Sequence, residues 1–372
     1  MADLSDITML TYIEESPAQM TALLERRDEY VGALVDAFCA GDYASVWLVA
    51  CGSSSNASAC ARPFMRKYLG REVSVVNPTS FCFAEFEPPA DVFCPVISQS
   101  GCSTNSVEAL DHARALGRLA VGITGNANSD FKDHAALLVD YGVGSEYVGY
   151  VTKGVTTLAE FLMLFALEVA RREARVSAEE YADLIAQFAH TPELHCQMQA
   201  EAKRFYAQHE KELTSLGPVY SVGFGQGYGV CCEGALKIGE TVKVPSFAYE
   251  AEEFAHGPNL QLTPAYTVFF VDDFGPAHER LYQIFDATCA ITDRAFFVTD
   301  DARVDDAHAL RAPADRPAER LLSPLYVLPA FQLIAYLATT ALDSWAEHPL
   351  MRGYHERFAT KTETIKDVMP LL

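Results

Sequence analysis

The hexapeptide Ser98-Gln99-Ser100-Gly101-Cys102-Ser103 follows an apolar run at residues 92–97, which predicts a buried β-strand. Gly101 lets the backbone of this polar loop approach a ligand closely. Residues 103–116 then place apolar side chains three and four positions apart, as in an amphipathic helix. Strand, polar loop and helix in this order predict an α/β unit that binds an anion at the helix N-terminus.

The segments around this loop recur in the second half of the chain. Three predicted strands of the first half have counterparts at nearly one offset: 46–52 with 219–225, 92–97 with 267–271, and 119–124 with 295–299. Continuous apolar strands that alternate with helices are typical of parallel sheets covered on both faces. We therefore predict an α/β protein with two doubly wound parallel-sheet domains related by internal duplication, plus N-terminal helices and a C-terminal tail.

Domain boundaries follow from this repeat. We expect an N-terminal helical segment at 1–42, a first domain at 43–176, connecting helices at 177–213, a second domain at 214–345 and a tail at 346–372. Pro17 is expected at the start of an N-terminal helix. Pro95 lies inside the predicted strand 92–97, where it removes a donor from the hydrogen-bond ladder.

Composition limits the partners. The chain has 372 residues and a net charge of −22, which disfavours binding to nucleic acid or to an anionic membrane. Ten cysteines without disulfide or metal-ligand spacing favour free thiols in a reducing cytosol. The N-terminus has no signal-peptide pattern, and the most apolar helix candidate, at 156–170, contains Glu160 and Glu168. We expect a cytoplasmic protein with no metal and no cofactor.

Two polar loops follow strands that we expect to be neighbours. The first contains Gly52, Ser53 and Ser54, and the second is the hexapeptide at 98–103. Hydroxyls and backbone N–H groups from both loops can donate to one phosphate without any Lys or Arg. Serine and glycine often only cap helices, but two such loops at the ends of consecutive strands favour a phosphate site.

At these residues the chain resembles the tandem sugar isomerase (SIS) domain proteins, over almost its whole length. The matching segments are 51–54, 98–103, 144–146, 152–153, 233–240 and 253–258. The resemblance implies a hexose 6-phosphate ligand whose phosphate is bound by Ser54, Ser98, Gln99, Ser100 and Ser103. It also implies substrate contacts from Gly52, Ser53, Glu146, Lys153, Glu233 and Lys237. Because Asp272 and Asp273 replace the serine loop in the second half, we expect one phosphate site per chain.

The resemblance also implies catalytic residues. Glu240 matches the general base of the family, and His256 matches the histidine that handles ring-oxygen or leaving-group protons. The spacing places Glu233, Lys237 and Glu240 on one helical face. Such a trio is often an exposed salt-bridge stripe, but the flanking apolar residues argue against that interpretation. Moving a proton between C1 and C2 of an open-chain sugar needs one carboxylate base and no metal.

The tail narrows the hypothesis. His348-Pro349-Leu350 and residues 357–363 are similar to the ending of fructosamine-6-phosphate deglycases, which implies that Lys361 contacts the substrate. The hypothesis is a deglycase that splits a 6-phosphorylated sugar–amino acid adduct into hexose 6-phosphate and free amino acid. The chain also resembles the isomerase half of glucosamine-6-phosphate synthase, but we expect no glutaminase domain and no full synthase activity.

Two alternatives stay open. One is an aldose–ketose isomerase or amino-sugar-phosphate deaminase that uses the same residues, and the other is a non-catalytic sugar-phosphate-binding regulator. The resemblance implies a homodimer or higher homo-oligomer, in which His256 acts in its own site or in a neighbour's. The amine part of the substrate is expected near Phe81-Cys82-Phe83 and the tail.

Overall fold

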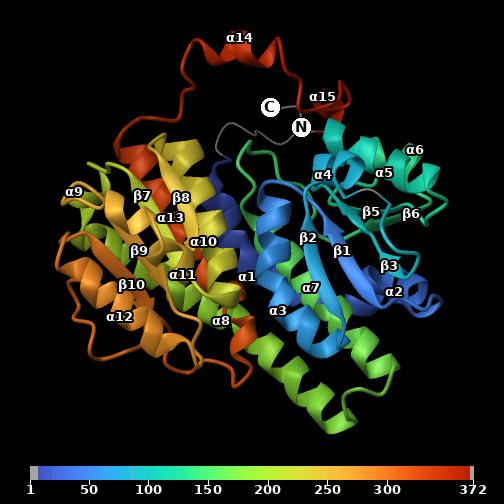
Figure 1. Ribbon diagram of the computed structural model, residues 1–372, viewed down its shortest axis with the longest axis horizontal. Coiled ribbons are helices and arrows are strands. Elements are labelled where there is room, and N and C mark those ends of the chain that lie inside the picture. The colour runs from blue at the N-terminus through green and yellow to red at the C-terminus, as the bar shows by residue number, and fades with distance from the viewer. Residues whose placement is uncertain (1–6, 86, 369–372) are drawn as a thin grey trace. The chain divides into compact units, whose positions relative to one another are not determined.

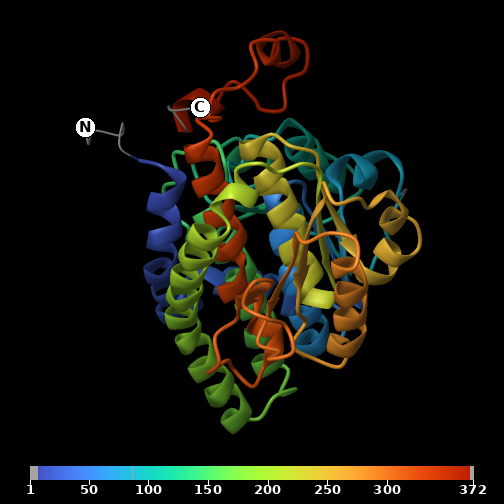
Figure 2. The same ribbon diagram turned by 90° about the vertical axis from the view of Figure 1, so that its left-hand side faces the viewer.

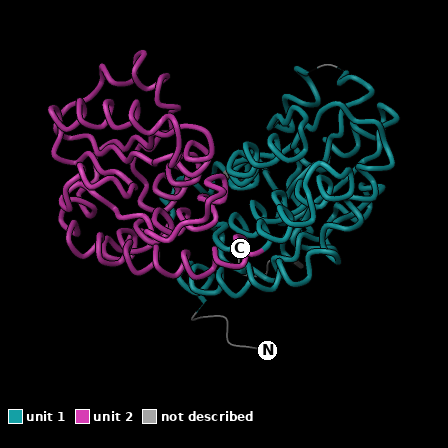
Figure 3. The backbone as a smooth tube through the Cα atoms, turned by 90° about the horizontal axis from the view of Figure 1, so that it is seen from below, with its two compact units in different colours: residues 1–185, 347–372 teal, residues 186–346 magenta. Residues whose placement is uncertain are grey.

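The computed structural model describes residues 7–85 and 87–368. It divides into two compact units: residues 1–185 with 347–372 form unit 1, and residues 186–346 form unit 2 (Figure 3). Each unit contains a parallel β-sheet flanked by helices (Figure 1). The predicted α/β class with two parallel sheets is therefore confirmed.

The sheet of unit 1 has the strand order β2-β1-β4-β5-β6, with β3 also paired to β1. Its strands are β1 (Ser45–Val49), β2 (Glu72–Val76), β3 (Val92–Phe93), β4 (Val96–Ile97), β5 (Val121–Thr124) and β6 (Leu137–Asp140). The pairs that build this sheet run parallel. The order reverses direction at β1, so a crevice opens between the carboxyl ends of β1 and β4, where ligands bind in such sheets.

The predicted strand at 92–97 is divided into β3 and β4 at Pro95. Both parts still run beside β1, and Val49 N donates to Pro95 O at 2.9 Å. Because proline has no N–H to donate, the ladder is interrupted at this residue.

Helices cover both faces of this sheet. They are α1 (Met9–Glu25), α2 (Arg27–Cys39), α3 (Ser53–Leu69), α4 (Pro78–Phe83), α5 (Thr104–Ala115), α6 (Phe131–His134) and α7 (Lys153–Arg172). α3 packs on α7, and α1 and α2 pack on the same helix. The core on the other face joins strand residues to α4, α5 and α6 through Phe81, Leu110 and Phe131.

Pro17 does not start a helix, which corrects the expectation from the sequence. It lies in the middle of α1, and Ser16 Oγ donates to Tyr12 O at 2.8 Å one turn earlier. An interior proline costs about 3 kcal/mol of helix stability. α1 offsets this cost by burying one face, which includes Tyr12, Ile13 and Met20, in a helix that packs against α7.

Unit 2 repeats the topology of unit 1. Its sheet has the order β11-β10-β9-β7-β8, with strands β7 (Val219–Gly223), β8 (Ser246–Glu250), β9 (Thr267–Val271), β10 (Ala295–Thr299) and β11 (Ala309–Arg311). All of these pairs are parallel. Counted from each unit's first strand, the two orders are the same, which confirms the two doubly wound sheets inferred from the repeat.

The helical elements of unit 2 complete the repeat. They are α9 (Glu210–Leu213), α10 (Gly225–Lys237), the π-turn η1 (Ile238–Val242), α11 (Ala251–Ala255), η2 (Pro258–Gln261), α12 (His278–Cys289), η3 (Arg320–Leu322) and α13 (Pro324–Ala341). The long helix α8 (Ala178–Gln208), green in Figure 2, connects the two units. The tail, red in the same view, contains α14 (Met351–His355) and α15 (Ile365–Val368).

The most apolar helical segment is not the one expected at 156–170. Among the described residues, only Arg320–Ala341 is long and apolar enough to cross a membrane by length and composition. Of its most apolar window, 89% is buried inside the structure, as in the core helix of a globular domain.

Candidate functional site

The serine loop (residues 98–103) connects β4 to α5 at the carboxyl edge of the sheet of unit 1. Ser98, Ser100 and Ser103 are all buried, and Ser98 Oγ donates to Ser103 Oγ at 3.1 Å. Ser100 Oγ accepts from Cys102 N at 3.3 Å, so the loop turns back on itself. The three hydroxyls therefore gather at the N-terminus of α5, where unpaired backbone N–H groups favour an anion.

Gly101 is required for this loop. Its φ is +61°, a conformation that favours glycine. A Cβ at this position would lie 1.9 Å from Ser129 Oγ and 2.8 Å from Thr124 Oγ1. The loop therefore packs directly against the end of β5 and the loop that follows it. A larger residue at position 101 would push the serines outward.

The loop that follows β1 lies next to the serine loop. Gly52, with φ +59°, precedes α3, and Ser53 and Ser54 form its first turn. Asn105 in the first turn of α5 donates to Cys51 Sγ at 3.5 Å, which ties the two loops together. The N-termini of α3 and α5 thus face one crevice. This is expected because these helices follow β1 and β4, which are parallel neighbours in the sheet.

The C-terminal tail adds a cation to this crevice. Lys361 Nζ donates to Ser100 Oγ at 3.0 Å and to Ser103 Oγ at 2.9 Å. Ser103 and Lys361 also form an antiparallel β-bridge. Thr362 N donates to Cys102 O at 2.9 Å, and Thr104 N to Thr360 O at 3.2 Å. The backbone of the tail is therefore fixed along the serine loop, with its ammonium on two of the loop's hydroxyls.

Asp130, at the start of α6, is a residue that the sequence did not single out. Its carboxylate accepts hydrogen bonds from Thr362 Oγ1 and, at 2.7 Å, from Thr364 Oγ1. Burial raises the pKa of Asp130, but hydrogen bonds from Thr362, Thr364 and Cys102, together with the nearby His134, more than offset this, so the net shift is downward. A charged Asp130 therefore anchors the tail on both sides of Glu363.

Glu146 is a buried cap of α7. Its Oε1 accepts from Thr152 N at 2.6 Å and Lys153 N at 3.0 Å, and its Oε2 accepts from Gly154 N at 2.9 Å. Oε2 also accepts from Gln99 Nε2 at 2.6 Å. Burial raises the pKa of Glu146, which these bonds partly oppose. The carboxylate thus orients the Gln99 side chain of the serine loop.

Lys153, at the first position of α7, does not point its ammonium at the serine loop. Its Nζ donates to Glu15 Oε2 at 2.9 Å and to Ser145 O at 3.3 Å. It also lies 5.0 Å from the centre of the Tyr12 ring. Lys153 therefore connects the N-terminal helix α1 to the loop that carries Glu146.

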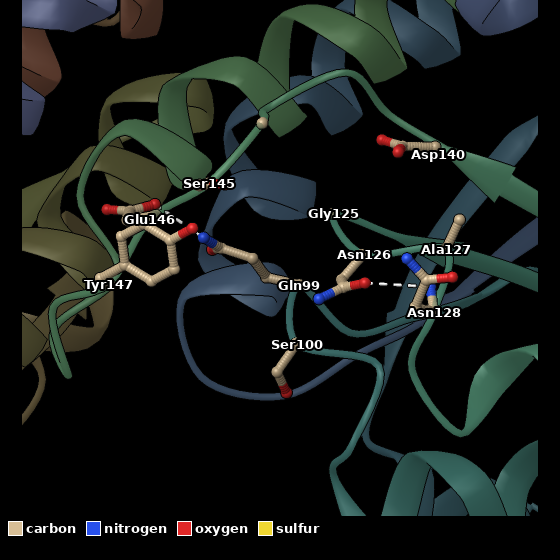
Figure 4. A pocket seen from close by; sticks show the side chains of 11 residues that line it. Gln99, Ser100, Gly125, Asn126, Ala127, Asn128, Asp140, Ser145, Glu146 and Tyr147 are labelled. Carbon is tan, nitrogen blue, oxygen red and sulfur yellow. Dashed lines mark hydrogen bonds between the residues drawn. The ribbon is translucent and has the colours of Figure 1, made fainter. Parts of the chain in front are cut away.

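A pocket opens beside the serine loop, between the loops that follow β4, β5 and β6 (Figure 4). Its volume is about 340 Å³. We call it the polar pocket, and it is lined by Gln99, Ser100, Gly125, Asn126, Ala127, Asn128, Asp140, Gly144, Ser145, Glu146 and Tyr147. Gln99 and Ser100 belong to both the pocket and the serine loop.

The corresponding loop of unit 2 is filled by its own ion pairs. His278 lies between Asp272 Oδ2 at 2.7 Å and Asp301 Oδ2 at 2.8 Å. Asp273 Oδ2 pairs with Arg320 Nη1 at 3.1 Å. Two buried carboxylates with internal cations leave this loop unsuited to a phosphate, which supports the expected single site.

Unit 2 carries the predicted trio on α10 and η1. Lys237 Nζ lies 3.2 Å from Glu233 Oε1 and also forms an ion pair with Glu240 Oε1. Glu233 and Lys237 are fully buried, whereas the Glu240 side chain is 28% exposed. The trio therefore shares one helical face, as predicted, and it is not a solvent-exposed stripe.

Glu240 lies within a π-turn, an irregularity often found at functional sites. Burial raises the pKa of Glu240, and Lys237 partly opposes that rise. Burial lowers the pKa of Lys237. The carboxylates of Glu233 and Glu240 raise it by a larger amount, so the net shift is upward and the ammonium stays charged. A partly exposed carboxylate with a raised pKa and a fixed cation has the properties of a general base.

His256 ends α11 in unit 2 and is exposed. Its Nδ1 lies 2.7 Å from Glu252 O and donates to it, which leaves Nε2 unprotonated in the neutral ring. Among the described residues, His256 and Glu240 share no hydrogen bond or ion pair.

No family model matches the chain. Over 300 residues it is 26% identical to glutamine–fructose-6-phosphate aminotransferase (isomerizing) of Zymomonas mobilis, covering 78% of this chain and 48% of that protein. The chain thus spans about half the length of this curated relative.

Solved structures share the fold. A candidate phosphosugar isomerase of Clostridium difficile superposes with a TM-score of 0.85 at 20% identity, covering 96% of this chain and 99% of that one. For the tagatose-6-phosphate ketose/aldose isomerase of Escherichia coli the TM-score is 0.72 at 17% identity, with 94% and 98% covered.

The fold is that of the tandem SIS proteins. The chain therefore shares the two-sheet fold of these solved structures, and it is similar in sequence to part of the aminotransferase.

Proposed function

We propose that this protein is an enzyme that binds a hexose 6-phosphate and moves a proton between C1 and C2 of its open-chain form. The observation that carries the proposal is the contact of Lys361 with Ser100 and Ser103. An ammonium held by two buried hydroxyls at a helix N-terminus is a set of donors suited to a phosphate. Fructose 6-phosphate and tagatose 6-phosphate, named for two similar proteins, are ligands of this chemical class.

The phosphate ligands are the serine-loop hydroxyls, Gln99, Ser54 and the N-termini of α3 and α5. Lys361 supplies a positive charge at the site of a protein whose net charge is −22. Gly52 and Ser53 provide backbone N–H groups at the start of α3. Glu146 and Lys153 act as positioning residues, because their polar atoms bond to backbone, Gln99 and Glu15.

The finer proposal is a deglycase that acts on a 6-phosphorylated ketosamine, a sugar that carries an amine at C1. Glu240 removes a proton from C1, and the C2 carbonyl becomes the hydroxyl of an enaminol. Return of a proton to C2 gives an imine at C1. Water adds to this carbon, and the C–N bond breaks to release hexose 6-phosphate and the free amine, with His256 carrying protons. Lys237 and Glu233 hold Glu240 in place.

A second candidate is an aldose–ketose phosphosugar isomerase or amino-sugar-phosphate deaminase, which uses the same proton shift. The structural similarity to a ketose/aldose isomerase favours it. A non-catalytic regulator would need the serine loop but not the buried pair of Glu233 and Lys237 that supports Glu240, so this pair favours an enzyme.

Two assays on the purified protein separate the candidates. The deglycase predicts amine release from a 6-phosphorylated fructosamine together with hexose 6-phosphate in equal amounts. The isomerase predicts interconversion of aldose and ketose 6-phosphates without any amine. Glu240→Gln should abolish either reaction while the phosphosugar still binds. Unchanged turnover in that variant would contradict the role of Glu240.

A further inference from the structure

The π-turn that carries Glu240 ends at Lys243, in a backbone conformation that is unusual for lysine. Lys243 has a φ of +64°, in the left-handed region that favours glycine. Its N–H donates to Ile238 O at 3.2 Å, which closes the turn. Strain of this kind persists only where other contacts hold the residue in place. We therefore looked at what the Lys243 side chain contacts.

The Lys243 ammonium connects the π-turn to the end of α13. Its Nζ donates to Thr241 O at 3.2 Å, to Trp345 O at 3.5 Å and to Ser344 O. Ser344 and Trp345 lie just after the C-terminus of α13, where backbone carbonyls attract a cation. One cation thus joins two segments of unit 2 that are 101 positions apart in the chain.

Thr241, the residue after Glu240, is held from both sides. Its Oγ1 donates to Lys237 O at 2.8 Å, the carbonyl that would accept from the N–H of Thr241 in an α-helix. Its own carbonyl accepts from Lys243 Nζ and, at 3.3 Å, from Ser344 Oγ. These bonds favour the wider π-turn over a regular helical turn. Because the two geometries rotate side chains by different angles, the π-turn sets the direction of Glu240 relative to Lys237.

The helix α13 is a rigid support for this contact. It packs on both α10 and the π-turn, and it lies beside α10 in Figure 1. A Cβ on Gly234 would lie 2.4 Å from the ring of the buried Phe331, so α10 and α13 approach each other closely. At the end of α13, Asp343 has a φ of +50° and Ser344 N donates to Thr339 O at 3.0 Å. This hydrogen bond fixes the backbone that Lys243 contacts.

From these contacts, and resting on the proposed role of Glu240, we infer that Lys243 is a positioning residue for this general base. Lys243 acts through the backbone and does not touch the substrate. Its ammonium ties the carbonyl of Thr241 to α13, and this keeps the Glu240 carboxylate beside the Lys237 ammonium. Without the Lys243 ammonium the turn relaxes, and Glu240 loses part of its contact with Lys237.

The experiment follows the exchange of a C1 proton for deuterium in heavy water by NMR. The probes are fructose 6-phosphate and the 6-phosphorylated fructosamine of butylamine, which both carry the C1 protons that Glu240 is proposed to remove. Lys243→Met removes the ammonium and keeps an unbranched side chain. It should lower the exchange rate at a saturating probe concentration about tenfold. The affinity for fructose 6-phosphate should not change, because the proposed phosphate ligands belong to unit 1.

The pH profile of this exchange separates positioning from stability, because a cation at a helix C-terminus often contributes only stability. Among the described residues, Lys237 and Glu233 are the charged groups that act on the pKa of Glu240. Lys237 lowers this pKa, so a weaker contact raises it. The acid limb of the exchange rate should therefore move to higher pH in Lys243→Met.

Three further variants complete the test. Lys243→Arg keeps a cation that can donate to the same carbonyls, so it should restore most of the rate and return the acid limb toward its original position. Lys243→Gly removes the ammonium and the backbone strain together, so it should match Lys243→Met and replaces that variant if it does not fold. Lys211→Met, on the exposed helix α9 of unit 2, is the control and should change neither quantity.

The outcomes distinguish this inference from the proposed function. An unchanged rate and profile in Lys243→Met and Lys243→Gly would overturn the inference alone. A lower rate with an unmoved acid limb, or an equal loss in Lys243→Arg, would show that Lys243 only stabilises the fold and would also overturn the inference. If the unmodified protein exchanges the C1 protons of neither probe, the proposed function is wrong, and the inference is wrong with it.

Discussion

Lys361 Nζ and Ser103 Oγ lie 2.9 Å apart although 258 positions separate them in the chain. One belongs to the tail and the other to the N-cap of α5. This contact brings a positive charge to a loop, residues 98–103, that has no Lys, Arg or His of its own. It makes the tail part of the proposed phosphate site of unit 1.

Lys361→Ala should weaken the binding of fructose 6-phosphate about tenfold or more, because a charge-assisted hydrogen bond is worth about 1.5–3 kcal/mol. Isothermal titration calorimetry provides the measurement. Lys366→Ala is the control, since Lys366 lies on the same tail and pairs with the exposed Glu363. Equal affinity in the Lys361 and Lys366 variants would show that Lys361 does not bind the phosphate.

Asp130→Asn should loosen the tail. Without the charge that accepts from Thr362 and Thr364, the tail leaves the serine loop more often, and phosphosugar affinity should fall about fivefold. Hydrogen exchange at residues 360–364 should become faster in the ligand-free protein. Asp133→Asn, on the same short helix, should change neither quantity. Unaltered exchange in Asp130→Asn would refute the anchoring role.

The pH dependence of catalysis should report Glu240. A general base works only when deprotonated, so the rate should fall as the pH drops through the raised pKa of Glu240, above the ordinary value of about 4.3. Lys237 opposes that rise, so Lys237→Met should move the acid limb of kcat/KM to higher pH. Lys237→Arg should return the limb toward its original position.

Lys211→Met, in the exposed helix α9, is the control for this profile and should leave the limb in place. If the limb does not move in Lys237→Met, the profile does not report Glu240.

His278 should make stability depend on pH in one direction. Burial lowers the pKa of His278, but Asp301 and Asp272 raise it by a larger amount, so the net shift is upward. Its stabilising contribution is complete below the ordinary value of about 6.5 and is lost as the pH rises through the raised pKa. The difference in unfolding free energy between the unmodified protein and His278→Gln should therefore shrink as the pH increases. A difference that stays constant across this range would contradict the charged pair.

The two sheets and the shared helical face of the trio could be predicted from the sequence. Continuous apolar strands recur at one offset, and spacings of three and four residues place Glu233, Lys237 and Glu240 on one face. These signals are local, so they can be recognised in the sequence without knowledge of tertiary contacts.

Other features depend on contacts between distant segments and were missed. Asp130 has no local signal, because its role arises only when Thr362 and Thr364 dock on it. Pro17 was expected at a helix start, but burial against α7 outweighs its cost inside α1. The π-turn at Ile238–Val242 likewise has no spacing that distinguishes it from a continuous α10.

We propose above that the serine loop and Lys361 hold the phosphate of a sugar phosphate. The most direct measurement compares the binding of fructose 6-phosphate and of fructose to the unmodified protein and to the double variant Ser100→Ala/Ser103→Ala. We expect saturable binding of the phosphorylated sugar only, with an affinity that falls about thirtyfold or more in the double variant. Equal binding of both sugars, or full affinity in the double variant, would contradict it.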